Sequence, residues 1–119
     1  MLNIGSFNVG GQRVFVVAEI GNNHNGSFEK ALEMIDAAAN AGSDCVKFQM
    51  RNMASVYRKK SLNKQGDDLG TEYVLDLLER FELSQEEHRE VAQYCASKGI
   101  LYMCTPWDID SISILEEFD

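Results

Sequence analysis

The sequence predicts an α/β protein with a parallel β-sheet. Three short apolar segments, at residues 14–20, 45–50 and 100–105, have the length and the β-branched or aromatic content typical of strands. Apolar residues recur at helical spacing in the segments between these strands and after the last one. Strands that alternate with helices indicate βαβ units, in which the strands run parallel.

The N-terminal part begins with a small hairpin predicted at residues 1–12, where apolar and polar residues alternate around glycines. Residues 14–20 are nearly all apolar, as expected of a strand that is covered on both faces. Ser27 is placed to cap a helix and Gly42 to end it. The apolar residues at helical spacing between them are Phe28, Ala31, Leu32, Ile35, Ala38 and Ala39.

The middle of the chain holds the second strand, CVKFQM at residues 45–50, and then a long connection, residues 51–83. This connection contains a basic run at residues 58–60 and a predicted helix at residues 71–81. Connections of this length in α/β units are commonly active-site lids or binding loops. A disordered surface excursion is the alternative interpretation.

The C-terminal part begins with Ser84 and Glu87, which have the spacing of a capping box and predict a helix that ends at Gly99. The third strand, residues 100–105, follows directly. The final helix is expected to begin at Asp108 or Asp110 and to carry Ile112, Leu115 and Phe118.

The composition is that of one globular domain, with 119 residues of which 45% are hydrophobic and 25% charged. The net charge of −8 argues against broad binding to nucleic acids or anionic membranes, because both use basic surfaces. Residues 1–11 lack the basic start and apolar stretch of a signal peptide, so a cytoplasmic location is expected. The cysteines include no CxxC pair and are expected to be reduced core thiols: Cys45, Cys95 and Cys104.

Polar residues gather where the predicted strands end. Strand side chains alternate between faces, so Glu19 falls on one face of the first strand and Lys47 and Gln49 share one face of the second. Thr105 ends the third strand. If these faces look the same way, the four side chains meet at one edge, where α/β barrels and open α/β sheets place active sites.

The residue types at this edge suit a substrate that carries both an anionic group and hydroxyl or amide groups. Lys47 lies near the end of an apolar strand and needs an anionic partner, for which a phosphate, a carboxylate or Glu19 would serve. Thr105 offers a hydroxyl and a backbone N–H before a helix start, a suitable phosphate contact. Gln49 can donate and accept hydrogen bonds toward sugar hydroxyls or an amide.

The stretch AEIGNNHNG after the first strand has the composition of a turn. Asn23, His24 and Asn25 are expected to support this loop. His24 could also bind a metal or transfer a proton, but a lone loop histidine is more often structural. His88 is expected on a helix surface and has no assigned role.

Four motifs, AEIGNNHNG, DCVKFQ, ELSQEEH and CTPWD, resemble in order and spacing the N-acetylneuraminate (sialic acid) synthase family, which includes the synthases of legionaminic, pseudaminic and spore-coat sugars. The resemblance covers essentially the whole chain, and AEIGxNHNG followed by VKFQ is a specific pairing. It implies a (β/α)8 TIM barrel, a fold of about 250 residues. Residues 1–119 are therefore expected to be the N-terminal part of such a domain, about three β/α units plus the hairpin.

The resemblance also implies a reaction. Phosphoenolpyruvate condenses with an N-acetylated aminosugar, such as N-acetylmannosamine, to give a sialic-acid-type nonulosonic acid and phosphate. In the family, residues matching Lys47 and Thr105 hold phosphoenolpyruvate, the match of Gln49 contacts the aminosugar, and the match of Glu19 lines the reacting centre. A divalent metal, Mn²⁺ or Mg²⁺, is implied for the longer parent chain, with no metal ligand within this chain, and a homo-oligomer such as a dimer is expected.

Two alternatives stay open at this point. A Schiff-base aldolase would also place a lysine such as Lys47 at the end of a barrel strand. A non-catalytic fragment, or a module that binds phosphate or phosphoenolpyruvate, would keep the motifs without turnover, and the 119 residues alone are expected to be inactive. The motif CTPWD also departs from the commoner STPFD, which changes Cys104 and Trp107.

Overall fold

The computed structural model describes residues 2–56 and 71–118. In chain order its elements are β1 (Leu2–Ile4), β2 (Phe7–Val9), β3 (Val17–Gly21), α1 (Phe28–Asn40), β4 (Cys45–Met50), α2 (Met53–Val56), α4 (Thr71–Arg80), α5 (Gln85–Lys98), β5 (Leu101–Pro106) and α6 (Ile109–Leu115). The strands β3, β4 and β5 form a parallel sheet in that order, and β1 pairs antiparallel with β2. The predicted α/β class and the predicted N-terminal hairpin are confirmed.

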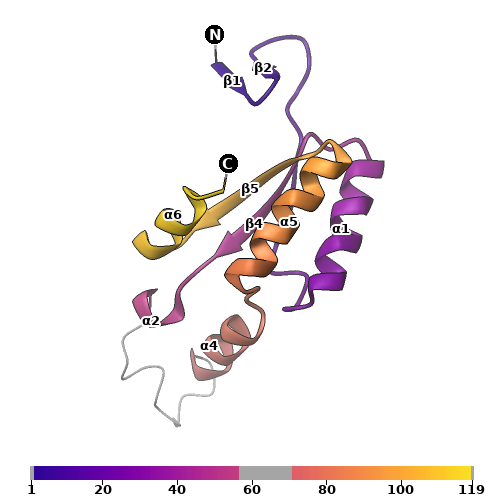
Figure 1. Cartoon of the computed structure of the whole chain (residues 1–119). Coiled ribbons are helices and arrows are strands. Elements are labelled where there is room, and N and C mark those ends of the chain that lie inside the picture. The colour runs from indigo at the N-terminus through magenta and orange to yellow at the C-terminus, as the bar shows by residue number, and fades with distance from the viewer. Residues whose placement is uncertain (1, 57–70, 119) are drawn as a thin grey trace.

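Helices α1 and α5 lie side by side on one face of the β3-β4-β5 sheet (Figure 1). The buried core fills the space between these helices and the sheet, with Ile35 from α1, Val46 and Phe48 from β4, and Val91 and Cys95 from α5. The hairpin lies at the end of the sheet where the strands begin, whereas α2 and α4 lie beyond the end where they stop (Figure 1). Residues that leave the carboxyl ends of the strands therefore face α2 and α4.

The helix boundaries follow the predicted capping residues. The Ser27 side chain accepts a hydrogen bond from the Lys30 backbone N–H at the start of α1. Ser84 and Glu87 form the predicted capping box at the start of α5, and Gly99 ends that helix in the left-handed conformation, with φ of 70°. These caps set where both covering helices begin and end relative to the strands.

The first strand is shorter and more exposed than predicted. β3 begins at Val17 because the first residue of β4, Cys45, lies opposite it, and residues 14–16 precede this pairing. Val14 and Val16 are exposed, and Val17 is 40% exposed. The expectation of a strand covered on both faces is thus wrong for the described chain, since α1 and α5 cover only one face. The third strand also runs one residue later than predicted, from Leu101 to Pro106.

In its described residues, the connection between β4 and α5 contains the helices α2 and α4. α4 confirms the helix predicted at residues 71–81, and α2 was not predicted. The basic run at residues 58–60 lies outside the described residues. After β5, Asp108 rather than Asp110 caps α6, and this helix ends at Leu115, so that Phe118 lies beyond it.

The predicted core thiols are confirmed for Cys45 and Cys95, which are buried, while Cys104 is half-buried. Burial raises the pKa of all three, to about 11 for Cys45 and about 12 for the others, which keeps the thiols protonated.

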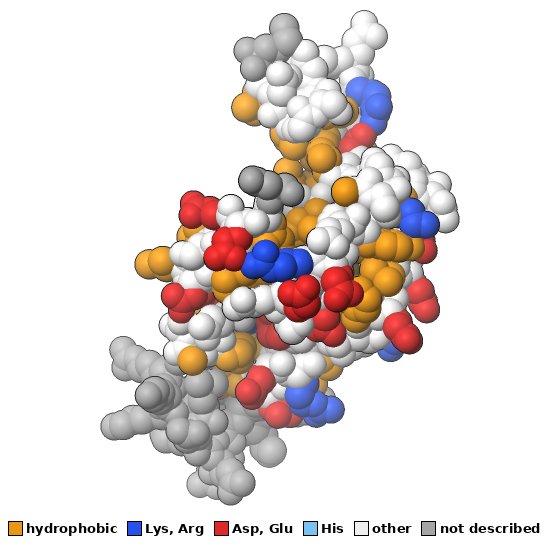
Figure 2. Space-filling view, in the orientation of Figure 1, with side chains coloured by type: hydrophobic (Ala, Val, Ile, Leu, Met, Phe, Trp, Pro, Cys, Tyr) orange, Lys and Arg blue, Asp and Glu red, His pale blue; other side chains and the backbone are white. Residues whose placement is uncertain are grey.

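On the face shown in Figure 2, the described Lys and Arg side chains are scattered among Asp and Glu. None of the helices in the described ranges combines the length and apolar character needed to cross a membrane.

Candidate active site

The four side chains predicted to meet at one edge lie on one face of the sheet. In the strand register, Glu19 of β3 is opposite Lys47 of β4, and Gln49 of β4 is opposite Thr105 of β5. The alternate residues of these strands, among them Val46 and Phe48, pack into the core on the helix side. The geometric part of the prediction is therefore confirmed: Glu19, Lys47, Gln49 and Thr105 occupy the face that α1 and α5 leave uncovered.

Lys47 and Glu19 form an ion pair, with 2.9 Å between Lys47 Nζ and Glu19 Oε2. Their side chains are 37% and 46% exposed, so both keep contact with solvent. A pair this exposed contributes little to stability, about 0–1 kcal/mol. Glu19 is one of the anionic partners expected for Lys47, and the exposed ammonium can still be approached by a phosphate or carboxylate.

The backbone around Glu19 is irregular. The pairing of β3 with β4 shifts between Glu19 and Gly21, and Gly21 has φ of 54°. A Cβ atom at this position would lie 3.3 Å from both Glu19 Oε1 and Gln49 Nε2. The glycine thus leaves space for these two polar groups to flank the backbone at the end of β3.

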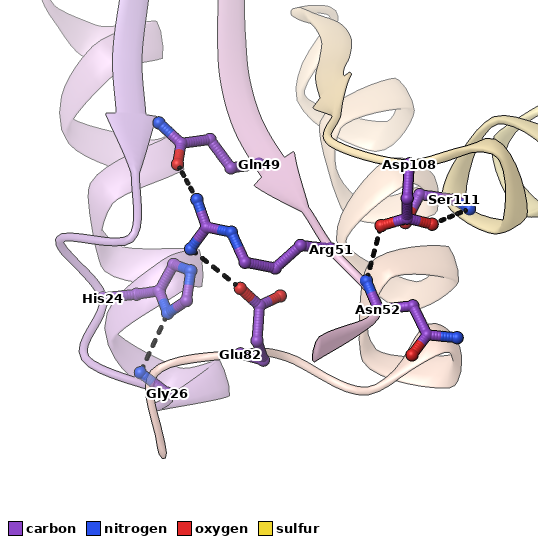
Figure 3. Close-up of polar contacts among 8 residues, drawn as sticks. All are labelled: His24, Gly26, Gln49, Arg51, Asn52, Glu82, Asp108 and Ser111. Atoms are coloured by element: carbon purple, nitrogen blue, oxygen red, sulfur yellow. Dashed lines mark hydrogen bonds and ion pairs between the residues drawn. The ribbon is translucent and has the colours of Figure 1, made fainter. Parts of the chain in front are cut away.

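Gln49 is held by Arg51, which was not among the site residues predicted from the sequence. Arg51 Nη2 donates to Gln49 Oε1 over 2.7 Å, and Arg51 Nη1 contacts Glu82 Oε1 at 3.1 Å (Figure 3). The strand alternation that selected Lys47 and Gln49 extends to position 51, and this signal could have identified Arg51. Burial raises the pKa of Glu82, while the adjacent Arg51 acts in the opposite direction.

The loop after β3 is built from its own polar groups. Asn23 donates from its side chain to the Ile20 carbonyl oxygen over 2.9 Å, and Asn25 adopts a left-handed conformation with φ of 55°. His24 is 1% exposed, and its Nδ1 accepts a hydrogen bond from the Gly26 N–H over 3.0 Å (Figure 3). The Nε2 atom of His24 is buried without a hydrogen-bond partner, and burial lowers the pKa of the His24 ring. Stacking on the core residue Phe48 favours the structural interpretation of His24.

The expectation for His88 was wrong, because this residue is buried rather than exposed. It is 1% exposed, and its Nδ1 lies 3.0 Å from the Tyr102 hydroxyl, beside Phe48. Burial lowers the pKa of His88 to about 4, so the ring is neutral at pH 7. Helix α5 carries the polar residue His88 on its core face because the Tyr102 hydroxyl supplies a hydrogen-bond partner there.

The described residues contain no group of three His, Cys, Asp or Glu side chains that could hold a metal ion. His24 and His88 lie on the helix-covered side with Phe48 between them. Glu19 lies on the opposite face, paired with Lys47. The described residues therefore offer no complete ligand set for a divalent metal, which the resemblance assigns to the longer parent chain.

Comparison with known proteins identifies relatives that are synthases of sialic-acid-type sugars. N,N'-diacetyllegionaminic acid synthase of Campylobacter jejuni is 31% identical over 89% of this chain and 33% of its own. Human N-acetylneuraminate-9-phosphate synthase is 31% identical over 93% of this chain and 32% of its own. A sialic acid synthetase structure from Leptospira borgpetersenii has a TM-score of 0.79 at 30% identity, over 98% of this chain and 38% of that one.

The family model described as NeuB family matches residues 34–119. The chain belongs to the NeuB family, which confirms the resemblance seen in its motifs. It spans about a third of the length of the curated relatives that it matches.

Proposed function

We propose that this chain is the N-terminal part of a (β/α)8 barrel that condenses phosphoenolpyruvate with an N-acetylated aminosugar. One observation carries the proposal: in a chain of the NeuB family, Glu19, Lys47, Gln49 and Thr105 share one face at the carboxyl ends of three parallel strands. Barrel enzymes place their active sites at this end of the strands.

The proposed chemistry gives each of these residues a role. The Lys47 ammonium and the Thr105 hydroxyl would bind the anionic groups of phosphoenolpyruvate, and Gln49 would contact the aminosugar. Carbon three of the enolpyruvate forms a bond with the aldehyde carbon of the open-chain sugar. Water adds at carbon two, and the bond from that carbon to the phosphate oxygen breaks to release phosphate. Glu19 would line this reacting centre next to Lys47.

The proposal includes a divalent metal, Mn²⁺ or Mg²⁺, which would polarise the sugar aldehyde when bound. No suitable cluster of ligands occurs among the described residues. We therefore place the metal ligands outside them, and no step by this chain's residues depends on the metal.

The test uses the protein expressed from its full reading frame, purified with Mn²⁺ present. We expect phosphate release from phosphoenolpyruvate only when an N-acetylated aminosugar is also added, with one nonulosonic acid formed for each phosphate. Phosphate release that does not depend on the aminosugar would contradict the proposal. The 119 residues expressed alone are expected to show no turnover, because they supply three of the eight β/α units.

The Schiff-base aldolase is less well supported. The relatives described above are named as synthases rather than aldolases. Borohydride reduction in the presence of pyruvate is expected to leave Lys47 unmodified, as measured by mass spectrometry. A stable pyruvyl adduct on Lys47 would restore the aldolase interpretation.

A further inference from the structure

Arg51 is a buried cation at the edge of the candidate active site. Its side chain is 3% exposed, and the guanidinium lies between the Gln49 amide and the Glu82 carboxylate (Figure 3). The Trp107 ring lies on a further side, 4.7 Å from the guanidinium carbon to the ring centroid. Three different segments of the chain, represented by Gln49, Glu82 and Trp107, thus fix the position of this side chain.

Stability alone does not explain such an arrangement. A buried ion pair has a desolvation penalty that can exceed the attraction between its charges. The Nε of Arg51 is also buried without a hydrogen-bond partner, which adds to the cost. Apolar side chains of similar volume could fill the same space, so the guanidinium points to a role in the neighbouring site.

The contact with Arg51 determines how the amide of Gln49 is oriented. A guanidinium only donates hydrogen bonds, so the atom of Gln49 that faces it has to be the acceptor, Oε1. The amino end of the amide then points away from Arg51. Gln49 Nε2 lies beside Gly21, where a Cβ would be 3.3 Å from it and equally far from Glu19 Oε1. The two N–H donors of Gln49 are therefore presented on the side of Glu19.

We propose that Arg51 is a positioning residue that locks the Gln49 amide with its NH₂ group toward the substrate. The inference rests on the proposed function, in which Gln49 contacts the aminosugar. It specifies the chemistry of that contact: the group of the sugar that meets Gln49 is a hydrogen-bond acceptor, such as a hydroxyl or N-acetyl carbonyl oxygen. The Trp107 ring, at a position where the family commonly has Phe, also packs against the Arg51 guanidinium and helps to fix it.

A double-mutant cycle in the full-length protein tests whether Arg51 acts through Gln49. We expect Arg51→Lys to raise the KM for the aminosugar about 10-fold, because a lysine cannot bond both Gln49 and Glu82 in the same planar geometry. The KM for phosphoenolpyruvate should change less than about 2-fold. In the Gln49→Ala background, Arg51→Lys should have almost no further effect on the aminosugar KM, as for residues that act as a unit.

Two controls separate positioning from general stability. Arg89 also combines an ion pair, with Glu117 at 2.6 Å, and a ring contact, with Phe118 at 5.1 Å, but it lies on α5. Arg89→Lys should leave both KM values unchanged. Glu82→Gln removes the ion pair while keeping the Arg51 contact to Gln49, and it should change the aminosugar KM less than Arg51→Lys does. Additive effects of Arg51→Lys and Gln49→Ala would overturn the proposal.

A second measurement needs no activity and no Arg51 variant. In ¹⁵N-labelled full-length protein, the Nη protons of Arg51 should exchange slowly with water, because both ends of the guanidinium are bonded. Gln49→Ala should accelerate exchange at Nη2 and leave Nη1, bonded to Glu82, protected. Unchanged protection at Nη2 would show that Arg51 does not hold the Gln49 amide. If the wild-type protein showed no aminosugar-dependent phosphate release, the proposed function would be refuted instead. Failure of the positioning role and failure of the proposed function are therefore distinguishable.

Discussion

The two faces of the β3-β4-β5 sheet differ in kind although the same strands build both. In β4, Val46 and Phe48 are fully buried under α1 and α5, whereas Lys47 and Gln49, one residue away, lie on the uncovered face. The covered face supplies the core, and the uncovered face carries the candidate site. Neighbouring residues of one strand should therefore have opposite mutational signatures, one in stability and the other in activity.

The largest effect is expected on the covered face. Phe48 is fully buried, and its ring contacts His24, His88 and Tyr102 at centroid distances of 5.8–6.2 Å. Phe48→Ala should lower the free energy of unfolding by about 3–5 kcal/mol, because it removes buried apolar contacts and leaves a cavity. Urea unfolding of the full-length protein followed by circular dichroism measures this change. A loss below 1 kcal/mol would mean that this face does not form the core.

The matching change on the uncovered face is Lys47→Ala. We expect the rate of phosphate release to fall about 100-fold to 1000-fold, the usual cost of removing one charge-stabilising donor from an active site. The urea midpoint should stay nearly constant, since the exposed pair with Glu19 contributes little to stability. Lys30→Ala, at an exposed position of α1, serves as the control and should alter neither quantity. Full activity of Lys47→Ala would remove Lys47 from the proposed site.

Acid should weaken the covered face. The pKa of His88 is lowered from 6.5 to about 4 by burial, and the pKa of His24 is lowered in the same direction. Between pH 6.5 and pH 4 the unfolded chain binds more protons, so stability falls as the pH falls, by about 3 kcal/mol for His88. Above pH 6.5 this contribution is complete and constant.

Urea unfolding between pH 4 and pH 7 checks this prediction. The variant His88→Leu cannot titrate at this position, so its loss of stability on acidification should be smaller than that of the wild type. Equal pH dependence in both proteins would contradict the assignment of the effect to His88.

The smallest effect is expected for a substitution of Gly21, the last residue of β3. Gly21→Ala places a residue with a Cβ at φ of 54°, which costs about 1–2 kcal/mol, and crowds Gln49 Nε2 and Glu19 Oε1 at 3.3 Å. Unlike Phe48→Ala or Lys47→Ala, this variant should lose both stability and affinity for the aminosugar. Chemical unfolding and the aminosugar KM, measured side by side, test this mixed signature. An unchanged KM would indicate that the amide of Gln49 is not confined there.

Much of this division was predictable from the sequence. Alternation along CVKFQM assigns Lys47 and Gln49 to one face, and capping residues such as Ser84 and Gly99 locate α5. Gln49 and Thr105 each lie near the end of a predicted strand, and the observed register places them opposite each other. These features are local, because a strand or a helix terminus follows from a few consecutive residues.

Features that depend on distant partners were not predictable in the same way. His88 was expected at the surface, because the hydroxyl of Tyr102 that accommodates it comes from another element. Arg51 follows a strand and was assigned to the long connection, although its partner Glu82 and the ring of Trp107 make it part of the site. Residues 14–16 have strand composition, but they precede the first residue pair of β3 and β4, and Val16 reaches β4 only through its carbonyl oxygen.

The ion pair between Arg51 and Glu82 also affects how this fold can diversify. It joins two residues that are 31 positions apart, at the two ends of the connection between β4 and α5. Lengthening a segment whose ends are already held together is inexpensive, since each doubling of a flexible loop costs about 0.6 kcal/mol. Because this pair ties the start of the connection to its end, the length of the connection can change without moving the carboxyl ends of the strands. The pair thereby separates the geometry of the candidate site from the length of the connection.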